Sequence, residues 1–275
     1  MSTASMAADS KAAPVFVRET REGPVYRITL ANAPARNALS RAAMTDISAA
    51  LTRATEDANA RVVVIGHEGP AFSAGHDLKE MQAARRSADG GRAFYDALFA
   101  QCSDMMMQVV RCPKPVIAEV DGVASAAGCQ LVASCDLAYA SETSRFATPG
   151  VNIGLFCSTP MVALTRNVAR KHAMEMLLTG EMIGAEDAQG IGLLNRAVPQ
   201  ADLTATVRQV AETIASKSPL TLKTGKEAFY VQAEMGLADA YAYTARVMAE
   251  NMMARDAAEG IGAFVEKRTP TWTGS

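Results

Sequence analysis

Hydrophobic residues between positions 15 and 140 alternate between strand-like and helix-like patterns. Runs rich in β-branched residues at 15–17 and 25–30, separated by Gly23-Pro24, predict a two-stranded ribbon. The run 61–65, in which four β-branched apolar residues follow Arg61, predicts a buried strand. A helix is expected between them, behind Ser40 as its N-cap, because apolar residues recur there at helical spacing: Met44, Ile47, Leu51 and Ala54.

The same alternation continues along the chain. Further strands are expected over 115–120 and 137–140. Further helices are expected over 78–86, 92–111 and 126–134. Strands that alternate with helices in this order favour an α/β core.

Helical patterns dominate from about residue 159 to the end, where strand patterns almost vanish. The first residues are rich in alanine and serine and lack an apolar segment. We therefore divide the chain into a flexible tail over 1–14, an α/β core over 15–200 and a helical region over 201–275.

Composition excludes several classes of partner. The 275 residues are 49% hydrophobic, and 27 basic residues against 29 acidic ones give a net charge of −2. A nucleic-acid-binding protein normally carries a basic surface, so no nucleic acid is expected as a partner. The longest uncharged stretch, 122–135, is too short and too polar for a bilayer span, so no membrane is expected either.

Cysteine and histidine usage bears on compartment and on metals. The five cysteines are odd in number and form no CxxC pair, which favours reduced thiols and a cytoplasmic location. The three histidines have no spacing that would place two of them on one metal ion. No metal site is expected.

The segment 70–81 combines the end of a strand, a glycine and the immediate start of a helix. Asp77 and Glu80 have the spacing of a capping box. Free peptide N–H groups at such a helix start, here near His76, suit a developing oxyanion. An ordinary capped turn explains the same residues, because every helix start leaves such groups unpaired.

The segment 121–131 has the same form. Gly122 breaks a strand, and the helix that follows begins with small residues only, which let a ligand approach the backbone. Close packing of a helix on a strand explains the small residues equally well. Two such starts in one α/β core make a pair of converging N–H donors plausible.

Together, several motifs from about residue 15 to the end resemble the crotonase (enoyl-CoA hydratase/isomerase) superfamily. They are Ile28-Thr-Leu, Ala38-Leu-Ser, Phe72-Ser-Ala-Gly-x-Asp-Leu-Lys-Glu, Gly122-Val-Ala-Ser-Ala-Ala-Gly-Cys, Cys135-Asp-Leu-Ala-Tyr-Ala, Thr179-Gly-Glu, Ala188-x-x-x-Gly-Leu-Leu and Phe264-Val-Glu-Lys-Arg. The run 148–160 is similar to one branch of the superfamily, the enoyl-CoA hydratase domain-containing proteins.

The resemblance implies an α/β fold, a crotonase spiral of ββα units with a C-terminal helical region used in trimer formation. It implies a homotrimer or hexamer that binds an acyl-CoA thioester, with coenzyme A as part of the substrate and no separate cofactor. The thioester carbonyl would lie in an oxyanion hole made by the amides of His76 and Ala127. His76 would act through its main chain, while its imidazole caps the site or faces solvent. A direct proton role for the ring is the minor alternative, because histidine titrates near neutrality.

The same resemblance assigns residues to substrate binding. Those that match segments lining the coenzyme A or the acyl group are Arg36, Ala38, Ala74, Asp77, Leu78 and Gly150. Phe264 and Lys267 match a C-terminal segment that touches the nucleotide end, often from a neighbouring subunit. Arg36 suits a phosphate because of its fixed fork of donors, although a solvated loop charge explains it equally well.

The chain departs from the superfamily pattern where hydratases carry two glutamates. Gln130 and Gly150 stand at those positions, and neither can move a proton at neutral pH. We therefore expect an enolate-stabilising enzyme with doubtful hydratase activity, in which Gln130 orients substrate or water. The alternative is a weakly catalytic or non-catalytic acyl-CoA binding or scaffold protein.

Two other side chains could supply proton chemistry or a nucleophile. Glu119 lies inside a predicted strand, where a carboxylate is unusual, and could swing in as a base or be purely structural. Cys157 precedes a helix that begins at Pro160, where a thiol pKa can be lowered, yet no histidine partner is evident.

Overall fold

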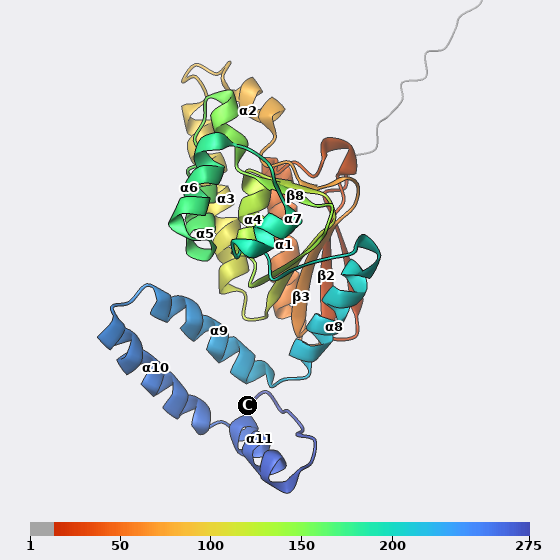
Figure 1. The fold of residues 1–275 in the computed structure, drawn as a ribbon, viewed down its shortest axis with the longest axis vertical. Coiled ribbons are helices and arrows are strands. Elements are labelled where there is room, and N and C mark those ends of the chain that lie inside the picture. The colour runs from red at the N-terminus through yellow and green to blue at the C-terminus, as the bar shows by residue number, and fades with distance from the viewer. Residues whose placement is uncertain (1–13) are drawn as a thin grey trace, which may run out of the picture.

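The computed structural model describes residues 14–275, so the tail predicted over 1–14 lies, apart from Pro14, outside the described residues. Figure 1 shows an α/β body with α2 at one end of the long axis and an arm of three helices, α9 to α11, at the other. The predicted α/β architecture is confirmed.

The larger sheet has six strands in the order β1-β2-β3-β5-β7-β10. β1 runs antiparallel to β2, and the remaining neighbours are parallel. The bounds are β1 (Val17–Glu22), β2 (Val25–Leu30), β3 (Val62–His67), β5 (Val116–Val120), β7 (Leu137–Ser141) and β10 (Arg196–Val198). The predicted ribbon is present, but β1 extends through charged residues, because an edge strand can turn polar side chains toward water.

A second sheet of four strands follows the order β4-β6-β8-β9. Its strands are β4 (Ala71–Ser73), β6 (Val123–Ser125), β8 (Arg145–Ala147) and β9 (Ile183–Gly184). Each turn of the chain places a strand in the large sheet and then one in the small sheet, as in β3–β4, β5–β6 and β7–β8. This repeat is the spiral of the fold, and it brings successive β4, β6 and β8 side by side.

Helices cover both faces of the large sheet. Those of the body are α1 (Arg41–Glu56), α2 (Leu78–Ala84), α3 (Arg92–Arg111), α4 (Ala127–Ser134), α5 (Pro160–Asn167), α6 (Arg170–Thr179), α7 (Ala185–Gly190) and α8 (Leu203–Ala215). Every residue of α4 is buried, which explains why its sequence is apolar all round. On the other face, Val207 of α8 packs with Val62 and Ile117 in a separate small core.

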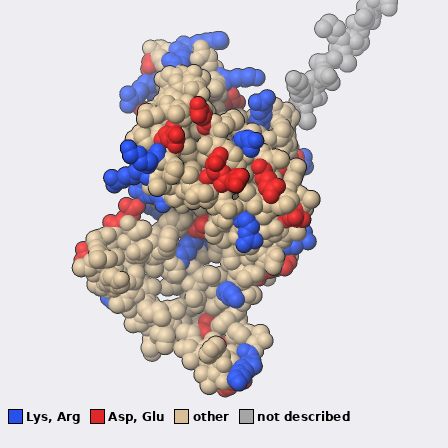
Figure 2. Space-filling view, viewed as in Figure 1, with Lys and Arg blue, Asp and Glu red and all other residues tan. Residues whose placement is uncertain are grey.

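The helical region predicted over 201–275 divides into two parts. α8 belongs to the body, whereas α9 (Pro219–Ala233), α10 (Leu237–Met252) and α11 (Arg255–Glu266) form the arm. Figure 2 shows that the visible face of this arm is mostly uncharged. Large apolar side chains are exposed along it: Phe229, Leu237, Tyr241, Met248, Ile261, Phe264 and Val265.

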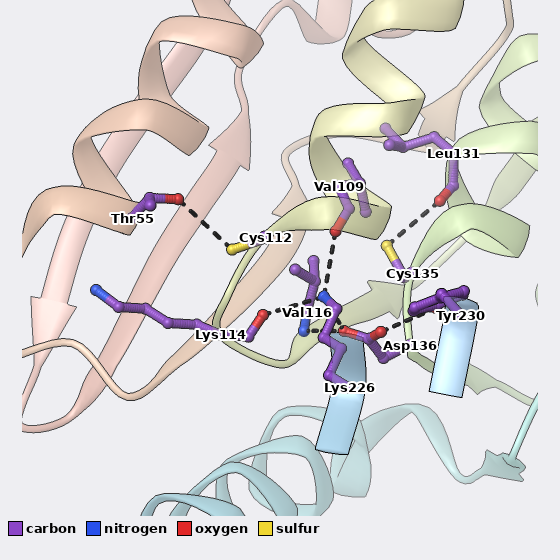
Figure 3. A network of polar contacts seen from close by, with 10 residues as sticks. All are labelled: Thr55, Val109, Cys112, Lys114, Val116, Leu131, Cys135, Asp136, Lys226 and Tyr230. Atoms are coloured by element: carbon purple, nitrogen blue, oxygen red, sulfur yellow. Dashed lines mark hydrogen bonds and ion pairs between the residues drawn. The ribbon is translucent and has the colours of Figure 1, made fainter. Parts of the chain in front are cut away.

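One buried ion pair fixes the arm to the body (Figure 3). The Lys226 ammonium on α9 donates to a carboxylate oxygen of Asp136 at 2.7 Å, and the same oxygen accepts from the Val116 amide at 2.7 Å. The Tyr230 hydroxyl donates to the other oxygen at 2.9 Å. The carboxylate thus joins α9 to the start of β5 with all its contacts satisfied.

Candidate active site

The two helix starts singled out in the sequence are neighbours in space. α2 follows β4 and α4 follows β6, and β4 pairs with β6 in parallel, with Ser73 opposite Ala124. Because parallel neighbours end at the same edge of a sheet, the segments that leave them emerge together. The pairing of two short strands therefore sets the position of both helix starts.

Gly75 lies directly against the start of α4. A Cβ atom added at Gly75 would be 2.9 Å from the Ala126 Cβ and 3.3 Å from the Ala127 amide nitrogen. Gly75 also has a φ of +87°, which side-chain-bearing residues rarely adopt. Only glycine therefore allows the peptide between Gly75 and His76 to lie beside the Ala127 amide.

The amides of His76 and Ala127 are unpaired. Within residues 14–275, no carbonyl or side chain accepts a hydrogen bond from either N–H group. The chain enters α4 through Ala126, whose φ of 49° and ψ of −117° are strained for alanine, and whose amide donates to the Ala147 carbonyl at 2.9 Å. This sharp turn leaves the next amide free.

A buried polar pair holds the segment before His76 in place. The Ser73 hydroxyl donates to the Asn37 carbonyl at 2.8 Å and accepts from the Gly75 amide at 3.2 Å. The Asn37 side-chain amide donates to the carbonyls of Glu68 and Ala71 at 3.0 and 2.8 Å. Sequence reasoning gave neither residue a role, although Ser73 lies inside one quoted motif and Asn37 directly precedes another.

The chain on either side of Asn37 pairs with the segment that carries His76. The Ala74 amide donates to the Arg36 carbonyl at 3.0 Å, and the Leu39 amide donates to the Gly75 carbonyl at 2.8 Å. These bonds place five of the residues predicted to bind coenzyme A on two paired segments: Arg36, Ala38, Ala74, Asp77 and Leu78. Whether they bind coenzyme A stays a prediction.

The side chains of this group differ in their surroundings. The Arg36 side chain is exposed, and Leu78 is 54% exposed at the first position of α2. The Asp77 carboxylate caps α2 by accepting from the amides of Lys79 and Glu80 at 2.8 and 3.2 Å. The capping box is only half formed, because the Glu80 carboxylate accepts from the Arg41 amide instead.

The His76 imidazole does not face solvent, which corrects one expectation from the sequence. Its Nδ1 lies 3.3 Å from the Leu39 carbonyl oxygen. Its ring packs edge-on against Phe99 of α3, with centroids 5.6 Å apart and planes at 77°. Burial lowers the pKa of His76, so the ring is neutral at pH 7.

Gln130 lies one turn inside α4 from Ala127 and is buried. Its Oε1 is 3.9 Å from the Cys102 thiol, which belongs to the same helix as Phe99. Burial raises the pKa of the Cys102 thiol to about 12, so it stays protonated and can donate. α3 and α4 therefore form one wall beside the two free amides.

Gly150 lies in a short 3₁₀ turn, Pro149–Ile153, and leaves no room for a side chain. A Cβ atom there would be 2.7 Å from the Leu155 carbonyl oxygen and 2.9 Å from the Cys157 sulfur. That sulfur accepts from the Gly150 amide at 3.3 Å. Burial raises the pKa of Cys157, contrary to the lowering considered from its place before a helix.

Glu119 is held away from this site, on the face of the large sheet that α8 covers. The guanidinium of Arg27 donates to both its oxygens, at 3.2 and 2.8 Å, and the Thr204 hydroxyl donates at 3.0 Å. Its neighbours along β5, Ala118 and Val120, belong to the opposite core. Glu119 is therefore structural in this conformation.

Phe264 and Lys267 lie on or just after α11, at the opposite end of the molecule from α2 (Figure 1). Phe264 is 85% exposed. A single chain does not bring them to the candidate site, so their contact with a nucleotide depends on a second copy and stays a prediction.

The described part of the chain contains neither a candidate membrane span nor a candidate metal-binding cluster. No helix within residues 14–275 is long and apolar enough to cross a membrane. The same residues contain no group of three or more histidine, cysteine, aspartate or glutamate side chains placed to hold a metal ion.

The chain is similar to known proteins over nearly its whole length. The family model described as enoyl-CoA hydratase/isomerase matches residues 20–275. The mitochondrial enoyl-CoA hydratase domain-containing protein 3 of Homo sapiens is 47% identical over 249 residues, which cover 90% of this chain and 80% of that protein.

Two crystal structures give the same result. An enoyl-CoA hydratase of Mycobacterium smegmatis has a TM-score of 0.89 at 47% identity, covering 94% of this chain and 99% of that one. Human enoyl Coenzyme A hydratase domain-containing protein 3 has a TM-score of 0.89 at 45% identity, covering 94% and 100%.

The names of the relatives correct the predicted location. Enoyl-CoA hydratase domain-containing protein 3 is named mitochondrial in human, rat, frog and mouse, which contradicts the cytoplasmic expectation. The inference was wrong because reduced cysteines indicate a reducing environment without distinguishing one such compartment from another.

The resemblance first seen in short motifs thus extends over the fold, the family match and sequence identities above 40%. The chain belongs to the enoyl-CoA hydratase/isomerase family, and its similarity is to the branch of enoyl-CoA hydratase domain-containing protein 3.

Proposed function

We propose that the protein binds an acyl-CoA thioester and stabilises its enolate between the amides of His76 and Ala127. The observation that carries this proposal is the pair of unpaired amides at adjacent helix starts, kept close by Gly75. Two fixed donors around a carbonyl oxygen favour the charge that develops there when a proton leaves the neighbouring carbon. Removing one such donor typically costs about 10²–10³ in rate.

We propose that this site hydrates enoyl thioesters only weakly. Hydration needs a base for the water and an acid for the carbon, and each contributes roughly 10²–10⁴ in rate. Gln130 offers an amide and Gly150 offers no side chain. The reaction therefore depends on forming the enolate, with Gln130 orienting the substrate or a water.

A binding or scaffold role is the second candidate, and the same two positions support it. A chain that kept the amides and the coenzyme A segments but lost both carboxyl groups could hold an acyl-CoA without converting it. Binding with a perturbed carbonyl but no turnover of any kind distinguishes this role from catalysis.

The test is the infrared band of a thioester whose carbonyl carbon is ¹³C-labelled. We expect the band to move to lower frequency on binding, because two N–H donors weaken the carbonyl bond. In Gly75→Ala the new Cβ would press on Ala126 and the Ala127 amide, so the shift should be lost. Gly90→Ala is the matched control, because Gly90 also has a positive φ, +65°, yet has nothing within 4 Å.

Two results would overturn the proposal: binding in calorimetry without any band shift, or an equal shift in Gly75→Ala. Loss of the conjugated thioester of crotonyl-CoA is measured in parallel. Turnover near the typical enzyme value of about 10 s⁻¹ would refute the statement that hydration is weak.

We also propose a homotrimer, or a hexamer of two trimers, built through the arm α9–α11. Its support is the row of exposed apolar side chains, among which Leu237 is 77% and Val265 73% exposed. Apolar surface of this extent normally lies in an interface. Light scattering of the purified protein tests it, and a monomer at micromolar concentration would refute it.

A further inference from the structure

One nitrogen of the His76 imidazole, Nε2, makes no hydrogen bond within the described residues. His76 Nδ1 lies 3.3 Å from the Leu39 carbonyl oxygen, and a carbonyl only accepts hydrogen bonds. Nδ1 therefore carries the proton, and in the neutral ring Nε2 keeps a free lone pair. Nε2 is buried and has no hydrogen-bond partner among the residues that the structure describes.

A buried imidazole nitrogen without a partner is costly, and such groups are uncommon in folded proteins. Here it belongs to the residue whose own amide is one of the two free donors. Phe99, against which the ring packs, is three residues before Cys102 on α3, and Cys102 contacts Gln130. The ring and Gln130 thus both contact α3, in the wall beside the two free amides.

Carboxylates on the described elements that pack around the ring have other partners, and Asp96 of α3 accepts from Arg92 at 2.7 Å. Of the charged groups on the elements packed around it, Asp77 caps α2 and Glu80 accepts from the Arg41 amide. Arg36, on the paired segment, is exposed. On α3, the Cys102 thiol stays protonated because burial raises its pKa to about 12.

We propose that His76 Nε2 is the acid–base group of the site, and that it removes and returns the proton on the carbon next to the thioester carbonyl. This step rests on the proposed function, because it needs the oxyanion held by the amides. Gln130 and Gly150 leave the step without a carboxylate, and the imidazole supplies what they lack.

The step balances without a co-reactant. The Nε2 lone pair forms an N–H bond to the α-proton, and the C–H electrons become the carbon–carbon double bond of the enolate. The carbonyl π electrons move to oxygen, which the His76 and Ala127 amides stabilise. The imidazolium then returns a proton to the α-carbon, or to the γ-carbon of an unsaturated chain, and is neutral again.

The experiment is deuterium exchange at carbon 2 of butyryl-CoA in D₂O, followed by mass spectrometry. This saturated thioester cannot be hydrated, so exchange reports only proton removal. His76→Asn keeps the backbone amide and an amide donor toward Leu39 but has no basic nitrogen. We expect it to lower the exchange rate by about 10²–10⁴ and to keep the infrared band shift.

His67 provides the matched control, because it is a second partly buried histidine with a buried nitrogen, Nδ1, that has no partner among the described residues. Its Nε2 accepts from the Asp121 amide at 2.9 Å, outside the candidate site. His67→Gln should exchange like the parent protein. The exchange rate of the parent should rise with pH and level off below the ordinary histidine pKa of 6.5, since burial lowers the pKa of His76.

The outcomes separate the two proposals. A band shift without exchange in the parent, or equal exchange in His76→Asn, overturns the role of Nε2 and leaves the oxyanion site standing. Absence of the band shift overturns the proposed function itself. Exchange that disappears in His76→Asn while the band shift remains supports both.

Discussion

The space at Gly150 can be tested by adding a single methyl group. In Gly150→Ala the Cβ would be 2.7 Å from the Leu155 carbonyl oxygen and 2.9 Å from the Cys157 sulfur. Both distances are shorter than Cβ atoms show in real structures, so the turn or the sulfur must shift. Overpacking of this kind typically costs about 1–3 kcal/mol of unfolding free energy.

Urea denaturation of Gly150→Ala, Cys157→Ala and the double variant measures this cost and its origin. Cys157→Ala removes the sulfur contact but also the acceptor of the Gly150 amide. The free energy of unfolding of the double variant should therefore exceed, by about 0.5–3 kcal/mol, the value expected from adding the two single effects. The Leu155 carbonyl remains, so relief is partial. Gly225→Ala, on α9 with nothing within 4 Å, should not destabilise the protein.

The same contacts predict how hydratase activity can be rebuilt. Gln130→Glu with Gly150→Glu restores both carboxyl groups in sequence, but the second needs the space that the Cys157 sulfur occupies. We expect hydration of crotonyl-CoA to rise only when Cys157→Ala is added. The reasoning is refuted if Gly150→Ala is as stable as the parent without coupling to Cys157, or if the two-glutamate variant hydrates equally well with and without Cys157.

Three further predictions concern the rest of the chain. Lys226→Met leaves the buried Asp136 carboxylate without its ion-pair partner and should lower the free energy of unfolding in urea by about 3–5 kcal/mol. Lys223→Met, at an exposed position on the same helix, should change it by no more than about 0.5 kcal/mol. Equal effects of the two substitutions would contradict the role of Lys226 in holding the arm to the body. Burial alone would raise the pKa of Asp256, but hydrogen bonds from Ser218, Thr273 and Gly274 lower it to about 2 in the folded protein. The ionised carboxylate therefore stabilises the folded state above the unfolded-state pKa of about 3.9, and this contribution is lost as the pH falls through about 2. The fluorescence of Trp272, the only tryptophan, should report release of the C-terminal segment in that range, and an unchanged signal until global unfolding would count against it. Glu119→Gln should leave deuterium exchange unchanged, and loss of exchange at full stability would restore Glu119 as a candidate base.

The hydrophobic pattern was enough to predict most of the fold. The helix behind Ser40 begins at Arg41, and the Ser40 hydroxyl accepts from the Ala43 amide as expected of a cap. The pattern could not place α8 with the body, because its apolar stripe looks the same whether it meets a sheet or another helix. Nor could it extend β1 through charged residues, since the pairing with β2 that holds them is not local.

The site was harder to predict because its geometry depends on contacts between distant segments. The sequence indicated two glycine-bounded helix starts, but only the pairing of β4 with β6 and the contact of Gly75 with Ala127 bring them together. The imidazole of His76 is a clearer case. Nothing local distinguishes a histidine that faces water from one that is closed in by Leu39 and Phe99, two residues 37 positions before it and 23 after it. Its unpaired nitrogen follows from the packing of α3 over that loop. In our proposals His76 therefore supplies both a backbone amide and a titratable ring to one site. From the sequence, a proton role for the ring rested only on the ordinary titration of histidine, because its surroundings depend on these distant contacts.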